Sequence, residues 1–529
     1  MSLTSGFRWV ATIWTLFFGA VCVGAPVSAL FSRLHGGTLF DPDILSLVRV
    51  TVTQAGASAM IAAVIGLPLG LLIAAGGAAA GARSARAFFF NEMLLAIPFS
   101  VPTAVAASSW VLILGRNGWL ARLGIPLDWS YSLKAVITAH VFFNAPWIAL
   151  WVAQARDRIP EGRFEAALTL GASAFSRFRF LEWPAVKWSF FAAATQAFSF
   201  CVMSFALVLI LGGGPPVQTL ETAVYSRLRF GTLDVGGAAA CAAWELLVTL
   251  LPWAAVLFFQ ARDPGRGARP ARERARGVGS FGARSWLPGV AFFAAAVFLL
   301  PYLAIFPASW RSIDIVPWSK EVLPAVAVSV KIAVTSAFFV VLTALAAVMS
   351  LSSPRLHPAV TTALASLASL SGGISALVLG LGFWLAFGRW VDPFEGSFAA
   401  IVAIQLALFF NVAFRIFWPL AQEPRRNLLE AAATLGADPA RAFFEIEWPR
   451  WRSSVAGAFA LVAAASIGEV AAVSLFYSEK LVPLPLLIVR WSAQYRFEAA
   501  QSASALLFVL SSGTVASVFI SFHWRGARD

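Results

Sequence analysis

The sequence predicts an all-α polytopic membrane protein with about twelve transmembrane helices in two parallel six-helix repeats. The first observation is composition: of 529 residues, 59% are hydrophobic and 12% are charged, and the mean hydropathy is +0.79. A soluble domain carries about a quarter charged residues, so this chain cannot cover a water-facing surface. The second observation is a series of long apolar runs, and the third is a polar segment that occurs twice.

Each apolar run is close to the ~20 residues that a helix needs to cross ~30 Å of hydrocarbon. The runs lie at residues 9–31, 46–77, 88–113, 132–155, 189–211, 239–260, 287–309, 325–350, 359–387, 396–420, 453–476 and 503–523. The runs 46–77 and 359–387 are long enough to be tilted or broken. The first run exceeds the apolar core of a signal peptide and has no clear cleavage site, so we expect a signal anchor or first spanning helix.

The distribution of basic residues predicts the orientation. With the N-terminus inside and alternating runs, the inside segments hold 24 of the 39 Lys and Arg residues and the outside segments hold 11. Because cytoplasmic loops are enriched in Lys and Arg, both termini are predicted to be cytoplasmic. The net charge of +13 is therefore a topology signal, and we expect no nucleic-acid partner.

A basic, Pro- and Gly-rich segment divides the chain. Residues 262–286 contain nothing that could pack a core and are typical of a cytoplasmic linker. Six runs precede the linker in a first repeat, 1–261, and six follow it in a second, 287–529. An even number of runs gives both repeats the same orientation, which places their symmetry axis along the membrane normal and a pathway at their interface.

The polar segment Glu165-Ala-Ala-Leu-Thr-Leu-Gly171, running on to Pro184, returns later in the chain from Glu430 to Pro449, and 11 of 20 positions are identical. Its composition predicts a short helix, a turn at the glycine, and a second short helix that the proline ends. Both copies, near 160–185 and 424–450, fall on the predicted cytoplasmic side. A single copy would suit an interfacial helix, whereas two copies favour two docking points for one type of soluble partner.

The stretch Phe142-Phe143-Asn144 also recurs, as Phe409-Phe410-Asn411, at nearly the same distance before the respective glutamates. The two repeats are therefore similar beyond the main motif.

These residues resemble the Glu-Ala-Ala motif of the permeases of binding-protein-dependent ABC importers, in which a glycine and then a proline follow the motif at the spacing found here. The resemblance implies the transmembrane domain of a type I importer, in which this segment is a coupling helix seated on a cytoplasmic ATPase. By position, it assigns ATPase coupling to Glu165, Ala166, Ala167, Gly171, Glu430, Ala431, Ala432 and Gly436.

The presence of both copies in one chain resembles the fused permeases for thiamine and for ferric iron, and the thiamine permeases are the more similar. The stretches that carry this resemblance are Gly115–Ala121, Ala139–Asn144, Phe178–Pro184, Leu211–Pro215 and Ser466–Glu469. It implies thiamine or a phosphorylated form as the solute, with ferric iron as the alternative. It also implies a multi-pass protein of the inner (plasma) membrane.

The sequence contains no Gly-x-x-x-x-Gly-Lys-Ser/Thr motif, so ATP hydrolysis is expected in a separate subunit, in two copies, and the chain is not expected to be an enzyme. No predicted external segment is long enough to capture a solute, which implies an extracytoplasmic binding protein. No cofactor and no metal are expected. A secondary transporter is a remote alternative, because ion coupling would not need duplicated docking segments.

Two carboxylates are candidate pathway residues. Glu469 and Glu245 lie within apolar runs, where an unpaired charge costs several kcal/mol, so each should face a cavity or a partner. A carboxylate near the route would suit the permanent positive charge of thiamine. The alternative for both is a structural carboxylate that is hydrogen-bonded to neighbouring helices.

The predicted topology can be tested by cysteine labelling in intact cells. Ala271→Cys, in the linker, should resist a membrane-impermeant thiol reagent until the cells are opened. Leu123→Cys, in a predicted outside segment, is the matched positive control. Labelling of Ala271→Cys from outside would invert the orientation.

Overall fold

The computed structural model describes residues 5–526 except 35, 80–94, 99–100, 117, 126–128, 130, 213, 215–216, 231–232, 264–286, 312–313, 315, 317, 352–370, 423–427, 429–430 and 433. The all-α prediction is confirmed, since the described residues form helices and no strand. Seven described helices are long and apolar enough to cross a membrane, or up to nine if each of two bent pairs is one span. Parts of the predicted runs 88–113 and 359–387 lie outside the described residues, and so does the linker after Asp263.

In residues 1–261 the elements are α1 (Ser5–Gly19), η1 (Ala20–Gly24), α2 (Ala25–Ser32), α3 (Gly36–Leu39), α4 (Pro42–Ala79), α6 (Thr103–Leu114), α7 (Trp119–Arg122), α8 (Leu133–Asp157), α9 (Glu161–Thr169), α10 (Ala174–Arg177), η3 (Phe178–Glu182), α11 (Trp183–Val202), α12 (Phe205–Gly212), α13 (Leu220–Arg229) and α14 (Val235–Ala261).

From residue 287 the elements are α15 (Leu287–Val297), α16 (Leu300–Leu303), α17 (Ile305–Arg311), η6 (Trp318–Val322), α18 (Leu323–Leu351), η7 (Ser371–Gly373), α20 (Ala376–Phe387), α21 (Phe398–Gln422), α23 (Pro439–Ala442), η8 (Phe443–Glu447), α24 (Trp448–Gly468), α25 (Ala471–Leu475), α26 (Leu484–Ala493) and α27 (Phe497–Gly526).

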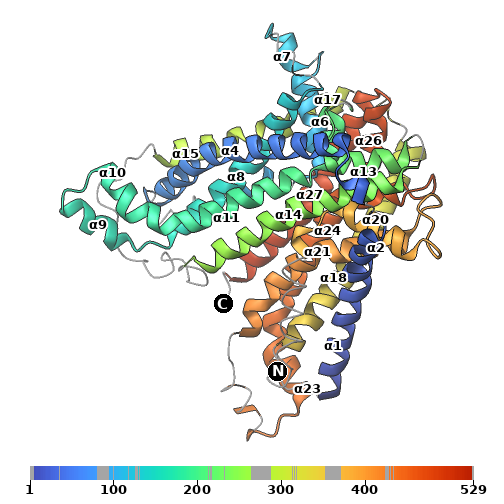
Figure 1. Cartoon of the computed structure of the whole chain (residues 1–529). Coiled ribbons are helices and arrows are strands. Elements are labelled where there is room, and N and C mark those ends of the chain that lie inside the picture. Colours follow the sequence, from blue (N-terminus) through green and yellow to red (C-terminus); the bar gives the residue numbers. More distant parts are fainter. Residues whose placement is uncertain are drawn as a thin grey trace.

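One helix-packing pattern occurs twice. Helix α4 packs on α8 and α11, as α18 packs on α21 and α24, and α11 packs on α14 as α24 packs on α27. The first helix of each series crosses over, because α1 packs on α18 and α15 packs on α4. Figure 1 shows the result as a V, with α9 and α10 at the tip of one arm, α23 at the tip of the other, and α13, α20 and α26 near the apex.

The polar contacts that join the two series include two made by arginines. Near the apex, the Arg229 guanidinium donates to the carbonyl of Leu475 at 2.6 Å and lies over the Tyr477 ring at 4.4 Å. Farther along the bundle, the Arg415 guanidinium donates to the Gln260 side-chain oxygen at 2.8 Å. An arginine that satisfies backbone carbonyls fixes the apex without needing a partner carboxylate.

At least three of the predicted runs are broken helices, among them 287–309, which bends by 56° between α15 and α16. The run 189–211 bends by 58° between α11 and α12. The run 453–476 was expected as one span, but α24 ends at Gly468 and a second helix, α25, begins at Ala471. A break at membrane depth requires that the freed backbone groups find partners inside the protein.

The prediction that Pro184 ends a short second helix is wrong. Residues 174–202 form one helix, in which the π-helical turn η3 precedes Trp183 and Pro184. The wider turn accommodates a proline that has no N–H to donate, so the helix passes through it. The polar segment is thereby continuous with a spanning helix.

Close approach of α4 and α8 depends on two glycines one turn apart. A Cβ atom at Gly70 would lie 2.5 Å from the Ala149 carbonyl oxygen and 2.7 Å from the Val152 Cβ atom. A Cβ atom at Gly66 would lie 2.9 Å from the Ala145 carbonyl oxygen. This small-xxx-small contact lets the two backbones pack directly on each other.

Gly70→Val should therefore force α4 and α8 apart and destabilise the protein by about 1–3 kcal/mol, the usual cost of overpacking. Gly56→Val on the same helix is the control, because a Cβ atom there meets nothing within 4 Å. Thermal unfolding of the purified proteins in detergent measures the difference. Equal melting temperatures for the two variants would contradict the close-packed interface.

Candidate functional site

The first duplicated segment ends its short helix in a Schellman motif. Gly171 has φ +71°, its N–H donates to the Leu168 carbonyl at 2.9 Å, and the Ala172 N–H donates to the Ala167 carbonyl at 2.9 Å. This pair of bonds satisfies the last carbonyls of α9, and the left-handed conformation favours glycine. The predicted turn at the glycine is therefore present.

The second copy has the same geometry where it is described. Gly436 has φ +80°, and the Ala437 N–H donates to the Ala432 carbonyl at 2.9 Å. Ala431 accepts from the Leu435 N–H at 3.0 Å. Glu430 lies outside the described residues. In both copies, the second alanine of the motif supplies the carbonyl that the turn caps.

Each turn carries a solvent-exposed leucine. Leu170 is 86% exposed, and Leu435, at the same place in the second copy, is 88% exposed. Glu165, Ala166 and Gly171 are exposed too, as are Ala431 and Gly436, while Ala167 and Ala432 are half-buried. Exposed apolar side chains at the same place in two copies mark a surface suited to a protein partner.

The first segment is tied to the spanning helices by Arg156, at the end of α8. Its guanidinium donates to the Glu182 carboxylate at 2.7 Å and lies 4.7 Å from the centroid of the Phe164 ring. Nearby, the Asp263 carboxylate accepts from Arg158 at 2.8 Å and from the Ser189 hydroxyl at 2.7 Å. The bond to Glu182 connects the segment to α8, and the bonds to Asp263 connect the end of α8 to α11 and to the residues that follow α14.

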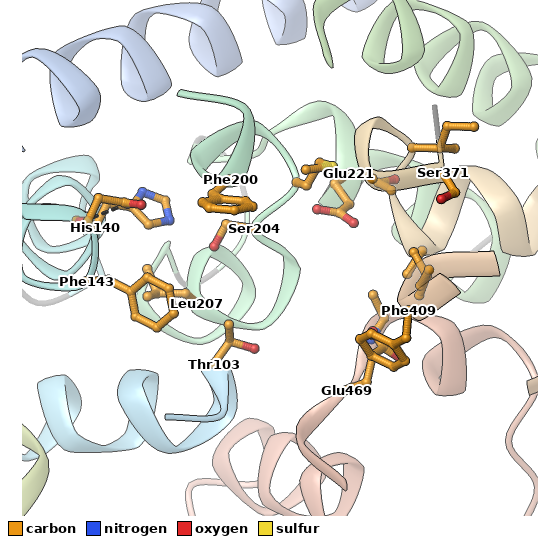
Figure 2. A pocket seen from close by; sticks show the side chains of 18 residues that line it. Thr103, His140, Phe143, Phe200, Ser204, Leu207, Glu221, Ser371, Phe409 and Glu469 are labelled. Atoms are coloured by element: carbon orange, nitrogen blue, oxygen red, sulfur yellow. Dashed lines mark hydrogen bonds between the residues drawn. The ribbon is translucent and has the colours of Figure 1, made fainter. Parts of the chain in front are cut away.

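A cavity of about 280 Å³ lies where the two helix series meet, close to the lower end of the ~300–1,000 Å³ typical of small-molecule sites. Its walls come from both halves of the chain. The first half supplies Thr103, His140, Phe143, Asn144, Phe200, Met203, Ser204, Leu207 and Glu221; the second supplies Ser371, Gly372, Ile374, Ser375, Ala376, Leu408, Phe409, Glu469 and Ala471. Figure 2 shows the two sets facing each other.

The cavity is built on the helix breaks and on the second repeated stretch. Ser204, between α11 and α12, pairs with Glu469, between α24 and α25, in the alignment that pairs Glu165 with Glu430. Phe143 and Asn144 on α8 and Phe409 on α21 line the cavity, so parts of both Phe-Phe-Asn copies reach the walls. Broken helices that line a cavity are typical of transport sites at membrane depth.

Glu469 lies in this wall, but its carboxylate is already used. One oxygen accepts from the Ala471 N–H at 2.7 Å and the other from the Ala472 N–H at 2.9 Å. It thereby caps the first turn of α25. Both interpretations of Glu469 are thus present together, a hydrogen-bonded structural carboxylate and a cavity residue.

Glu245 lies on α14, is fully buried, and is not among the residues that line the cavity. The carboxylates of Glu245 and Glu469 both lie close enough to a third carboxylate, that of Glu221 on α13, to repel its negative charge. The structure therefore brings the two predicted glutamates together around a residue that sequence reasoning missed.

Glu221 was missed because it lies between two apolar runs and was counted as part of an outside loop. In the structure, α13 folds back against α14, α4 and α20, and Glu221 is only 1% exposed. The signal available in the sequence is the single acid among apolar residues in Leu220-Glu-Thr-Ala-Val224, a segment that is buried along its whole length.

Comparison with known proteins gives one matching family model and a set of full-length relatives. Residues 66–262 match the family of binding-protein-dependent transport system inner membrane components. A thiamine transport system permease protein of Brucella abortus is 29% identical over 512 residues, covering 94% of this chain and 92% of the relative. Permeases with the same name from Haemophilus influenzae and Escherichia coli are 25% and 26% identical and cover 94% and 79% of this chain.

Proposed function

We propose that the chain is a fused, multi-pass permease of the binding-protein-dependent ABC importers and that it carries thiamine or its phosphates into the cytoplasm. The observation that carries the proposal is the similarity to thiamine permeases along 94% of the chain, through both halves. The carboxylates in and behind the wall of the cavity between the halves are in keeping with a cationic solute. Permeases of this family are membrane subunits and not enzymes themselves.

ATP is bound and cleaved, in this proposal, by two copies of a separate cytoplasmic ATPase, one seated on each duplicated segment. The leucines exposed at both turns supply apolar contact, and Glu165, Ala166, Ala167 and Gly171 form the first coupling site. Glu430, Ala431, Ala432 and Gly436 form the second. An extracytoplasmic binding protein delivers the solute to the other face of the inner membrane, and both termini are cytoplasmic.

The V in Figure 1 suits the inward-open state of an alternating-access cycle. The coupling segments lie at the separated tips, and Arg229 fastens the apex through the carbonyl of Leu475. Closure of the ATPase dimer would bring the tips together, and the bond from Arg156 to Glu182 would carry that movement into α8 and α11. ATP must bind the closed state better than the open one to drive this change.

Glu469 and Glu245 belong to the pathway in this proposal, Glu469 at the cavity surface and Glu245 behind it. Ferric iron remains the alternative cargo and an ion-coupled secondary transporter the remote one. Uptake by vesicles that contain the permease, ATPase and binding protein decides among them. ATP-dependent thiamine uptake supports the proposal; uptake of ferric iron alone, or thiamine uptake driven by an ion gradient without ATP, would overturn it.

The coupling role predicts a strong effect at Gly171. Its φ of +71° costs an L-residue roughly 1–2 kcal/mol and a β-branched one more, although a Cβ atom would meet nothing within 4 Å. Gly171→Val should therefore distort the turn and lower solute-stimulated ATP hydrolysis about tenfold or more, with membrane insertion intact.

Gly162→Val is the matched control, since Gly162 lies in the same short helix, is exposed, and has an equally open Cβ position. It should hydrolyse ATP like the wild type. Full stimulated hydrolysis by correctly inserted Gly171→Val would remove the basis for calling the segment a coupling helix.

The pathway role predicts slower thiamine uptake in Glu469→Gln. A cation ~4 Å from a carboxylate gains ~4 kcal/mol at an effective dielectric constant of ~20 before desolvation, so part of this term amounts to about tenfold in uptake. Glutamine keeps only one of the two oxygens that accept from Ala471 and Ala472. Assembly with the ATPase and unstimulated ATP hydrolysis must therefore be measured too; unaltered uptake would leave Glu469 with the capping role alone.

A further inference from the structure

The side chain of Glu221 points into the cavity between Phe200 and Ser204 of the first half and Phe409 of the second (Figure 2). It is 1% exposed, and neither carboxylate oxygen has a well-formed hydrogen bond within the described part of the chain. The Ser375 hydroxyl lies near enough to favour its charge. A buried, charged carboxylate with free acceptor capacity is costly unless it takes up a proton or something pairs with it.

The two neighbouring carboxylates differ from Glu221 in one respect each. Glu469 shares the cavity, but both of its oxygens accept backbone N–H groups of α25. Glu245 also has unpartnered oxygens, but it does not line the cavity. Glu221 alone of these three combines an unpartnered carboxylate with a place in the wall.

The rest of the wall suits a flat organic cation. The side chains of Phe143, Phe200 and Phe409 line it, and aromatic faces attract cations and stack on heteroaromatic rings. No lysine or arginine occurs among the described residues that line it, so the wall itself does not neutralise Glu221.

The two carboxylates with unpartnered oxygens, Glu221 and Glu245, both come from the first half of the chain. Helices α13 and α26 begin alike, since the Leu220 N–H donates to the Thr51 hydroxyl and the Leu484 N–H to the Ser329 hydroxyl, and in this register Glu221 corresponds to Pro485. Helix α27, the counterpart of α14, contains no acidic residue after Glu498. A symmetric structural requirement would place a similar residue in both halves. The one-sided carboxylates are better explained by an asymmetric ligand, charged at one end and held by an aromatic face at the other.

We propose that Glu221 is the counter-ion of a transient binding site for an aromatic organic cation, with Phe200 and Phe409 contacting its rings from opposite halves. The inference rests on the proposed function and deepens it, because it assigns the positive charge of the thiazolium ring of thiamine to one residue. Binding would then link the two halves across the cavity through a single ligand.

Equilibrium binding to the purified permease–ATPase complex in detergent, without the binding protein, tests this site. The probes are radiolabelled thiamine and its neutral isostere, in which a thiophene replaces the thiazolium ring. Glu221→Gln should weaken thiamine binding about tenfold or more, as expected for loss of a close ion pair, and change isostere binding less than twofold. Glu395→Gln, at an exposed position, should bind both probes like the wild type.

Equal weakening of the binding of both probes would show that Glu221 only shapes the cavity, and unchanged thiamine binding would show that it faces no cation. Either result overturns the inference. A wild-type complex that binds no thiamine would overturn it too. If Glu221→Gln does not assemble with the ATPase, Glu221→Leu, which also removes the charge, replaces it, with the same ratio of the two affinities as the readout. Thiamine uptake by the wild-type system is measured separately, so the inference can fail while the proposed function stands.

Discussion

Hydrocarbon offers no hydrogen-bond partner to a backbone N–H or carbonyl group, and the arrangement of this chain depends on that constraint. The helices break after Val202 and after Gly468, and both breaks lie at the wall of the central cavity. At the second break, the Glu469 carboxylate accepts the first free N–H groups of α25. The need to bury the breaks thus places polar backbone and side chains in the wall of the cavity between the halves.

The two halves share the same helix packing but differ in the residues that line the central cavity. The packing of α4, α8 and α11 is repeated by α18, α21 and α24, and both coupling turns end on a left-handed glycine. In the cavity, by contrast, Ser204 corresponds to Glu469 in the internal repeat, and Glu221 to Pro485. Equivalent ATPase contacts favour duplication, whereas a solute without two-fold symmetry favours divergence.

Long helices connect the duplicated polar segment to the central cavity. The glycines at 66 and 70 hold α4 directly against α8, and Arg156 holds the first coupling segment to the end of α8. Residues 174–202 carry the chain from that segment to the cavity as one helix, despite Pro184. Close packing of this kind has few alternative arrangements.

The sequence alone was sufficient for the all-α membrane class, because twelve apolar runs can satisfy their backbone only as helices, and for the turns at Gly171 and Gly436, because local hydrogen bonds set them. It also identified Glu469 and Glu245 as carboxylates out of place in apolar runs. Only the tertiary structure decided that Glu469 lies in the wall of the cavity, that Glu245 lies behind the wall, and that Glu221 points into the cavity. The physical reason is that α13 is buried by helices distant in sequence, and hydropathy along a chain cannot register burial by distant segments.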